Sequence, residues 1–261
     1  MRIDLTDKIA VVTGASRGIG LAISEALVEA GAFVVAGARR NSPQLEALEA
    51  AGSATFVAAD LSTAQGPKDL VAAAAERGGV DILVNNAGAV TPRFEGSQSV
   101  TDDDWTASWS LNFLSAVRTT REAIPHLLAR GGGAIVMVGS VNATLPEWNI
   151  IDYSATKAAL ANYTKSLSKE FGPQGIRVNT ISPGPVATDL WLADDGVAAQ
   201  FASTSGGSPE QVVDAVSAAA ATGRFTTPQE VADLAVFLAG NRATNITGAD
   251  VRIDGGYVTT L

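Results

Sequence analysis

The chain has 261 residues, 46% of them hydrophobic, and it carries a formal net charge of −9 with one histidine and no cysteine. Binding to a nucleic-acid backbone requires an extended basic surface, so we expect no nucleic-acid partner. The composition also excludes disulfides, a thiolate nucleophile and metal sites built from cysteines or several histidines, and we expect no metal.

No apolar run approaches the ~20 residues that a membrane-spanning helix requires, so we expect no membrane partner. The first residues, Met1 to Asp7, lack the apolar core of a signal peptide. From these two observations we expect a soluble, cytoplasmic protein.

Short apolar segments alternate with longer helical patterns along the whole chain. The expected strands are Ile9–Thr13, Phe33–Ala36, Ala54–Val57, Ile82–Asn85, Ala134–Val138, Arg177–Ser182 and Asp250–Ile253. The expected helices lie around Gly18–Ala30, Pro43–Ala51, Lys68–Arg77, Asp102–Arg130, Asp152–Phe171 and Pro228–Leu238. This alternation predicts an α/β fold, doubly wound, in which a seven-stranded parallel sheet has helices on both faces. No repeat or linker divides the chain, and we expect one domain over residues 1–261.

The first expected strand leads into a glycine-rich turn, Thr13-Gly14-Ala15-Ser16-Arg17-Gly18-Ile19-Gly20, followed by a helical pattern. Glycines allow a tight turn and a close approach of the backbone to a ligand, and the amino end of a helix attracts phosphate. The spacing is G-x-x-x-G-x-G rather than G-x-G-x-x-G. We therefore expect a nucleotide phosphate here, with a purely structural turn as the alternative.

The end of the second expected strand indicates which nucleotide binds. An acidic residue about twenty positions beyond the glycines would accept hydrogen bonds from the adenosine ribose of NAD. Here Ala38 occupies that place, Arg39 follows it, and Arg17 of the glycine turn could approach the same ribose. Because guanidinium groups favour a 2′-phosphate, we expect NADP(H). The alternative is that these arginines are merely solvated surface residues.

Tyr153 and Lys157 form a pair of polar residues, four positions apart, near the middle of the chain. Ser140 follows an expected strand, and Tyr153 and Lys157 open an alanine-rich helical pattern, so the two should share one helical face. A phenol titrates near ~10 and needs a stabilised anion to exchange protons at neutral pH. An ammonium one turn away would lower that pKa, and a hydroxyl could stabilise a substrate oxygen. Taken alone, however, the Tyr-x-x-x-Lys pair could be an ordinary exposed helical pair.

The stretch from Asp189 to Thr227 breaks the alternation and contains no convincing strand. It is long for a connection in a compact domain, so we expect a substrate lid at about 189–227. A pair of surface helices without a role is the alternative.

Together these motifs resemble the short-chain dehydrogenase/reductase family and its 3-oxoacyl-reductase-like branch. The resemblance is carried, in order, by Thr13-Gly14-x-x-x-Gly18-x-Gly20, Asn85-Asn86-Ala87-Gly88, Ser140, Tyr153-x-x-x-Lys157, Pro183-Gly184 and Asp254-Gly255-Gly256. It implies a Rossmann fold and hydride exchange between a nicotinamide and a carbonyl or secondary alcohol. It outweighs the exposed-pair interpretation of Tyr153 and Lys157.

The resemblance also implies roles for matching residues. Tyr153 would transfer the proton, Lys157 would lower its pKa and bind the nicotinamide ribose, and Ser140 would orient the substrate oxygen. Asn112 would join a proton relay to Lys157. The residues expected to bind the cofactor are Gly14, Ser16, Arg17, Gly18, Ile19, Gly20, Ala38, Arg39, Asp60, Leu61, Asn86, Ala87, Gly88, Tyr153, Lys157, Pro183, Gly184, Val186 and Thr188.

The substrate is less defined. Its expected contacts are Ser140, Asn142, Trp148, Tyr153 and Trp191, with Val90, Phe94, Leu145, Leu192 and Phe201 as further wall candidates. Since most of these are apolar, we expect a neutral, moderately apolar ketone or alcohol. Arg93 could receive an anionic group, or it could be a solvated arginine at the rim.

Other functions remain open at this point. A catalytically idle NADPH-binding regulator would commonly lack Tyr153 or Lys157, and an epimerase or dehydratase would usually have a larger carboxyl-terminal domain. An NAD-dependent alcohol dehydrogenase of the same family is a further alternative. The resemblance also suggests a homotetramer, with which the small residues Ala155, Ala158, Ala159 and Ala161 are compatible.

Overall fold

The computed structural model describes residues 3–260 and contains a parallel sheet with strand order β3-β2-β1-β4-β5-β6-β7. The strands are β1 (Ile9–Thr13), β2 (Phe33–Ala38), β3 (Ala54–Ala58), β4 (Ile82–Asn85), β5 (Gly133–Val138), β6 (Ile176–Pro183) and β7 (Asp250–Ile253). Their ends differ from the expected ones by at most two residues. The predicted doubly wound α/β fold is confirmed.

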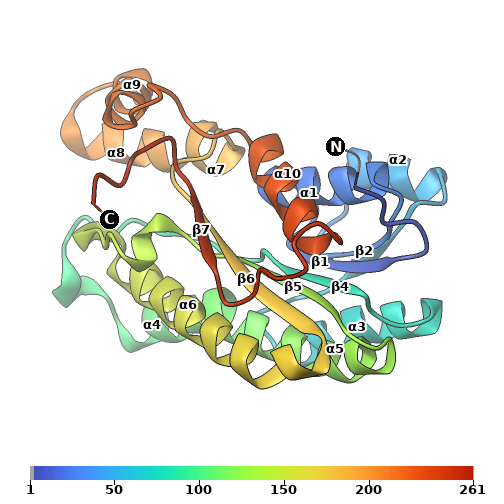
Figure 1. The fold of residues 1–261 in the computed structure, drawn as a ribbon. Coiled ribbons are helices and arrows are strands. Elements are labelled where there is room, and N and C mark those ends of the chain that lie inside the picture. The colour runs from blue at the N-terminus through green and yellow to red at the C-terminus, as the bar shows by residue number, and fades with distance from the viewer. Residues whose placement is uncertain (1–2, 261) are drawn as a thin grey trace.

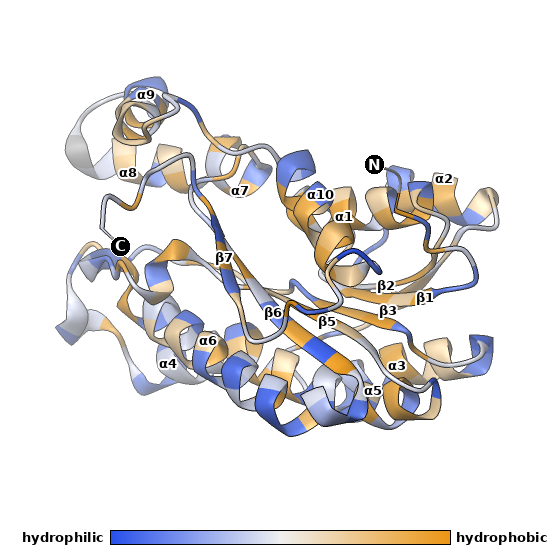
Figure 2. Ribbon diagram, in the orientation of Figure 1, coloured by the Kyte–Doolittle hydropathy of each residue, from blue (hydrophilic) through white to orange (hydrophobic). Residues whose placement is uncertain are grey.

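Helices cover both faces of the sheet (Figure 1). One layer contains α1 (Gly18–Glu29), α2 (Pro43–Ala50) and α10 (Pro228–Ala239), and the other contains α3 (Gln65–Arg77), α5 (Ser115–Ala129) and α6 (Ile151–Phe171). The strands between them are largely apolar (Figure 2).

Neighbouring strand residues pack into opposite layers. In β1, Ala10 and Val12 join the core under α1 and α10, whereas Ile9 and Val11 join the core under α3, α5 and α6. This alternation follows from the two-residue period of a strand. Because both faces are buried, the strand sequence is apolar throughout, as expected for a parallel sheet.

The helix expected over Asp102–Arg130 is interrupted, and that expectation is wrong in one respect. It consists of α4 (Asp102–Trp109), a π-helical turn η2 (Ser110–Leu114) and α5. A π turn carries one extra residue and often occurs at a functional site. No proline or glycine marks it in the sequence, so the pattern gave no signal for the break. Asn112 is buried within this turn.

The segment after β6 contains three helices, α7 (Asp189–Leu192), α8 (Val197–Ser205) and α9 (Pro209–Ala219). They form a separate group beyond the end of β6 (Figure 1). The remaining short turns are η1 (Ser97–Ser99), η3 (Val141–Ala143), η4 (Trp148–Ile150) and η5 (Gly172–Gln174). Within residues 3–260, no helix combines the length and the apolar character that crossing a membrane requires.

Candidate active site

A cavity of about 900 Å³ opens at the carboxyl ends of the strands. The strand order changes direction between β1 and β4, and ligands of open α/β sheets bind at such a switch point. All of the predicted cofactor residues lie on its wall, together with Ser140, Asn142 and Trp191. Two predicted site residues, Asn112 and Trp148, are not part of the wall.

In the glycine turn the absence of side chains lets backbone segments pack closely and leaves the backbone open to a ligand. Gly14 and Gly18 have φ angles of 66° and 55°, which favour glycine. A methyl group on Gly20 would overlap the carbonyl oxygen of Gly14. α1 begins at Gly18 and has no acidic residue in its first turn, so its amino end is suited to a phosphate group.

Hydrogen bonds between Asn86, after β4, and the end of β1 fix this turn, and we call them the Asn86 latch. The Asn86 side chain donates hydrogen bonds to the carbonyl oxygens of Thr13 and Gly14, at 3.0 and 3.2 Å. The Thr13 hydroxyl accepts hydrogen bonds from the backbone N–H groups of Asn86 and Ala87, at 2.8 and 3.0 Å. Asn86 therefore shapes the cavity by holding its wall, and the sequence gave no sign of the part played by Thr13.

The end of the cavity beside β2 is basic. Arg17, Arg39 and Arg40 are exposed on its wall, and none of them forms an ion pair with another described residue. Asp60 also lines this end, where hydrogen bonds from Ser62 and the charge of Arg39 lower the pKa of its carboxyl and keep it ionised. The three guanidinium groups outnumber this carboxylate and favour a phosphate ligand.

The proposed catalytic side chains converge from β5 and α6. Ser140 follows β5, and its Oγ donates a hydrogen bond to Asn142 Oδ1 at 3.0 Å. A hydrogen bond with Ser140 acts to lower the pKa of the Tyr153 phenol. Lys157 is 3% exposed, and its Nζ lies 5.5 Å from the centre of the Tyr153 ring. The three residues that the sequence indicated thus share one wall of the cavity.

Burial controls the proton affinities here. It raises the pKa of the Tyr153 phenol, an effect only partly opposed by the hydrogen bond with Ser140. Burial lowers the pKa of Lys157 to about 8. Desolvation is thus the largest influence on the phenol, and the effect of Lys157 on the pKa of Tyr153 stays a prediction.

Asn112 lies behind the cavity wall, next to Gly88. Its Oδ1 accepts a hydrogen bond from the Ala89 N–H at 2.9 Å. A methyl group on Gly88 would lie 2.8 Å from Asn112 Oδ1 and 3.7 Å from Lys157 Nζ. The π turn therefore brings Asn112 and Lys157 to the same glycine, although the two residues are far apart in the sequence.

The opposite end of the cavity, here called the substrate end, mixes apolar and polar groups. Its wall includes Val90, Asn142, Trp191 and Phe201, as expected, but not Phe94, Leu145 or Leu192. The structure does not support a substrate contact for Trp148, because η4 leaves this residue 63% exposed. Polar residues on the cavity wall that the sequence did not indicate include Glu147, Asn149 and Tyr257.

Glu147 and Tyr257 lie close enough to influence each other. Burial and then the charge of Glu147 raise the pKa of the Tyr257 phenol. They come from distant parts of the chain, the segment before α6 and the segment after β7. No local pattern could have paired them.

The chain belongs to the short-chain dehydrogenase family, whose model matches residues 8–195. It is 38% identical to D-threitol dehydrogenase of Mycolicibacterium smegmatis, over 97% of this chain and 94% of that protein. It is 34% identical to a 3-oxoacyl-(acyl-carrier-protein) reductase of Vibrio harveyi, over 97% and 98% of the two chains. The resemblance stated above is confirmed.

The fold is likewise close to that of solved relatives. The structure of L-sorbose reductase from Gluconobacter frateurii, complexed with NADPH and L-sorbose, superposes with a TM-score of 0.91 at 36% identity and covers the whole of both chains. The protein is therefore an oxidoreductase that uses a nicotinamide cofactor and acts on a carbonyl or alcohol. The glycine cradle and the open amino end of α1 fit such a dinucleotide.

Proposed function

We propose that this protein is an NADP(H)-dependent oxidoreductase that interconverts a carbonyl and a secondary alcohol. The observation that carries the proposal is the convergence of Ser140, Tyr153 and Lys157 in the same cavity as the glycine turn. The cofactor, when bound, supplies or accepts the hydride. The protein supplies binding, orientation and the proton.

Each catalytic side chain has a separate task. The Tyr153 hydroxyl donates its proton to the substrate oxygen during reduction and takes it back during oxidation. Ser140 holds that oxygen beside the phenol by a hydrogen bond. Lys157 supports the negative charge that remains on Tyr153 after proton transfer, and it binds the nicotinamide ribose. Asn112 connects Lys157 to the proton relay.

The preference for NADP(H) rests on Ala38 and the arginines around it. Ala38 is 7% exposed at the end of β2 and presents no carboxylate to a ribose. Arg17 and Arg39 are available to a 2′-phosphate, because both line the cavity and neither has an ion-pair partner among the described residues. A relative solved with NADPH and another solved with NADP add support.

For the substrate we propose a neutral, moderately apolar ketone, reduced to the alcohol. Val90, Trp191 and Phe201 supply apolar wall at the substrate end. A second candidate is a polyhydroxylated ketone or alcohol, which is favoured by Asn142, Glu147, Asn149 and Tyr257 on the same wall. The names of the D-threitol and L-sorbose relatives agree with this second candidate.

Helices α7 to α9 are proposed as the lid of one catalytic domain. They contribute Leu190, Trp191, Val197, Phe201, Val212 and Val216 to the cavity wall. Their movement would exclude water during hydride transfer. We further propose that the protein is a cytoplasmic homotetramer. Light scattering that detects only monomer would contradict the tetramer.

A substrate panel scored by NADPH oxidation tests the function. It should contain apolar ketones and ketoses of similar size, each assayed with NADPH and with NADH. Turnover with NADPH excludes an idle regulator, and a higher kcat/KM with NADH would identify an NAD-dependent alcohol dehydrogenase instead.

If ketoses are preferred, Glu147→Gln should raise the KM for ketoses at least tenfold, since a charge-assisted hydrogen bond contributes ~1.5–3 kcal/mol. The KM for apolar ketones should stay within about twofold of the wild-type value.

A further inference from the structure

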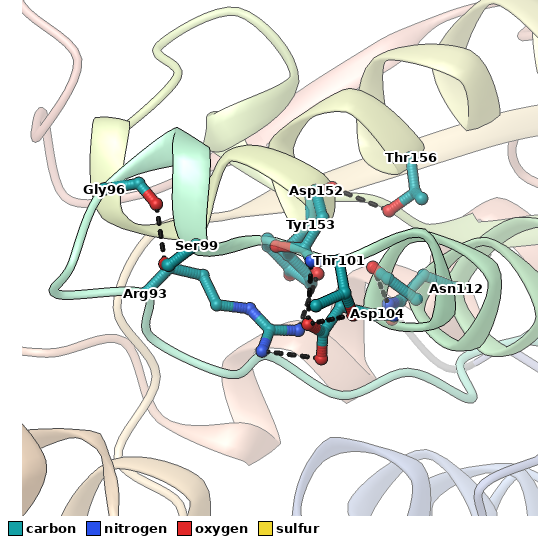
Figure 3. A network of polar contacts seen from close by, with 10 residues as sticks. Arg93, Gly96, Ser99, Thr101, Asp104, Asn112, Asp152, Tyr153 and Thr156 are labelled. Atoms are coloured by element: carbon teal, nitrogen blue, oxygen red, sulfur yellow. Dashed lines mark hydrogen bonds and ion pairs between the residues drawn. The ribbon is translucent and has the colours of Figure 1, made fainter.

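An ion network, buried at Asp152 and partly exposed at Asp104, joins α4 to α6 (Figure 3). Arg93 Nη1 lies 2.9 Å from Asp104 Oδ1 on α4, and Arg93 Nη2 lies 3.2 Å from Asp152 Oδ2 on α6. The side chains of Arg93 and Asp152 are 17% and 3% exposed. Arg93 is therefore neither a solvated rim residue nor available to an anionic substrate.

The Asp104 side of the network leads to Asn112. Asp104 Oδ2 accepts hydrogen bonds from the backbone N–H and the hydroxyl of Thr101, at 3.0 and 2.7 Å, which caps α4. α4 continues directly into the π turn that contains Asn112. A bond to Asp104 therefore restrains the start of the helix that delivers this amide to Gly88.

The Asp152 side leads to Tyr153, the next residue of α6. The Arg93 backbone N–H donates to the carbonyl oxygen of Asn149 at 2.6 Å, just before this helix. Asp152 Oδ1 has no hydrogen-bond partner among the described residues. The charge of this buried carboxylate is therefore compensated by the Arg93 guanidinium at Oδ2. Loss of Arg93 would leave a buried charge uncompensated, so the start of α6 would have to move.

We propose that Arg93 is a positioning residue that aligns the Asn112 turn with the Tyr153–Lys157 face of α6. The inference rests on the proposed function. Arg93 acts through two carboxylates and does not line the cavity. It also balances the charge of Asp152, which directly precedes Tyr153 in α6. Apart from Tyr153 and the groups at the basic end, the ionisable side chains on the cavity wall are Glu147, Lys157, Asp189 and Tyr257.

Hydrogen exchange provides a readout that does not depend on activity. Arg93→Gln should accelerate amide exchange in peptides covering residues 102–114 and 149–157, at least tenfold. The matched control is Arg130→Gln, because Arg130 also pairs with a buried aspartate, with both contacts to Asp81 at 3.1 Å. Asp81 precedes the central strand β4, at the amino ends of the strands and so away from the cavity. The control should change exchange only around residues 79–84 and 127–134.

Kinetics distinguish positioning from a general loss of stability. In Arg93→Gln, kcat should fall at least tenfold while the Kd for NADPH stays within twofold. For alcohol oxidation, the pH of half-maximal kcat should rise, because the unpaired Asp152 carboxylate opposes ionisation of Tyr153. Adding Asp152→Asn to Arg93→Gln removes that charge and should return this pH toward the wild-type value.

Several outcomes would overturn the inference. They are an unchanged exchange pattern in residues 102–114 and 149–157, or the same kcat and pH profile in Arg93→Gln as in Arg130→Gln. If Arg93→Gln does not fold, Arg93→Lys replaces it in both experiments. A wild-type kcat and a wild-type exchange pattern in Arg93→Lys would also overturn the inference. Absence of turnover in the wild-type protein would count against the proposed function alone, since exchange still decides the role of Arg93.

Discussion

Lys157 Nζ donates a hydrogen bond of 2.8 Å to the carbonyl oxygen of Val138, which ends β5 two residues before Ser140. The bond ties α6 to the strand that delivers Ser140, so one contact fixes the distance between the two halves of the catalytic group. It also satisfies a lysine that is almost fully buried. The consequences can be tested through pH.

Stability should increase with pH where Lys157 titrates differently in the two states. Its pKa is about 8 in the folded protein, against 10.5 in an unfolded chain. Between these values the unfolded chain binds more protons, so the free energy of unfolding should rise by up to ~1.4 kcal/mol per pH unit. Urea unfolding between pH 8 and pH 9 measures this slope, below the range in which Tyr153, Tyr163 and Tyr257, whose pKa values are raised in the folded protein, contribute strongly with the opposite sign.

The slope should disappear in Lys157→Met. Lys165→Met is the matched control on the same helix, because the Lys165 ammonium is exposed and bonds the carbonyl oxygen of Gly248. This control should keep the wild-type slope. Equal slopes in wild type and Lys157→Met would show that burial does not control the proton affinity of Lys157.

Tyr153→Phe should reduce kcat by ~10²–10⁴-fold, because the variant has no hydroxyl to transfer the proton. Cofactor affinity, measured by fluorescence titration, should stay within about threefold. Tyr163→Phe is the control on the same helix, since Tyr163 packs edge-on against Phe113 away from the cavity. A weaker cofactor affinity without a loss of kcat would contradict the role given to Tyr153.

Ala38→Asp should shift the preference from NADPH toward NADH. A carboxylate at the end of β2 repels a 2′-phosphate and can accept hydrogen bonds from the ribose hydroxyls of NAD. The ratio of kcat/KM values for the two cofactors should change by at least tenfold, or about 1.4 kcal/mol. An unchanged ratio would refute the argument from the second strand.

Gly20→Ala should weaken cofactor binding at least tenfold and lower the Tm, because its methyl group would overlap the carbonyl oxygen of Gly14. Gly172→Ala is the control, since a methyl group there has no atom within 4 Å. The control should match wild type in calorimetry and in cofactor titration. Similar behaviour of the two variants would mean that the close approach at Gly20 is unimportant.

Local patterns were enough to predict the sheet and the glycine turn, while the family resemblance supplied most of the other predicted residues of the cavity wall. The inner strands are largely apolar on both faces, and the glycine turn and the Tyr153–Lys157 spacing are short-range signals. What the sequence did not reveal depends on contacts between distant segments. Examples are the ion pairs of Arg93 with Asp104 and Asp152, and the approach of Glu147 to Tyr257. The π turn around Asn112 was missed because its residues are ordinary helix residues.

The Asn86 latch has a consequence for how the nucleotide is received. Since its amide already holds the carbonyl groups of Thr13 and Gly14, the phosphate cradle is preorganised and little chain entropy is lost on binding. The exposed arginines at 39 and 40 stand outside this rigid frame. A redesign of cofactor choice can therefore alter that border of the cavity while the cradle itself remains intact.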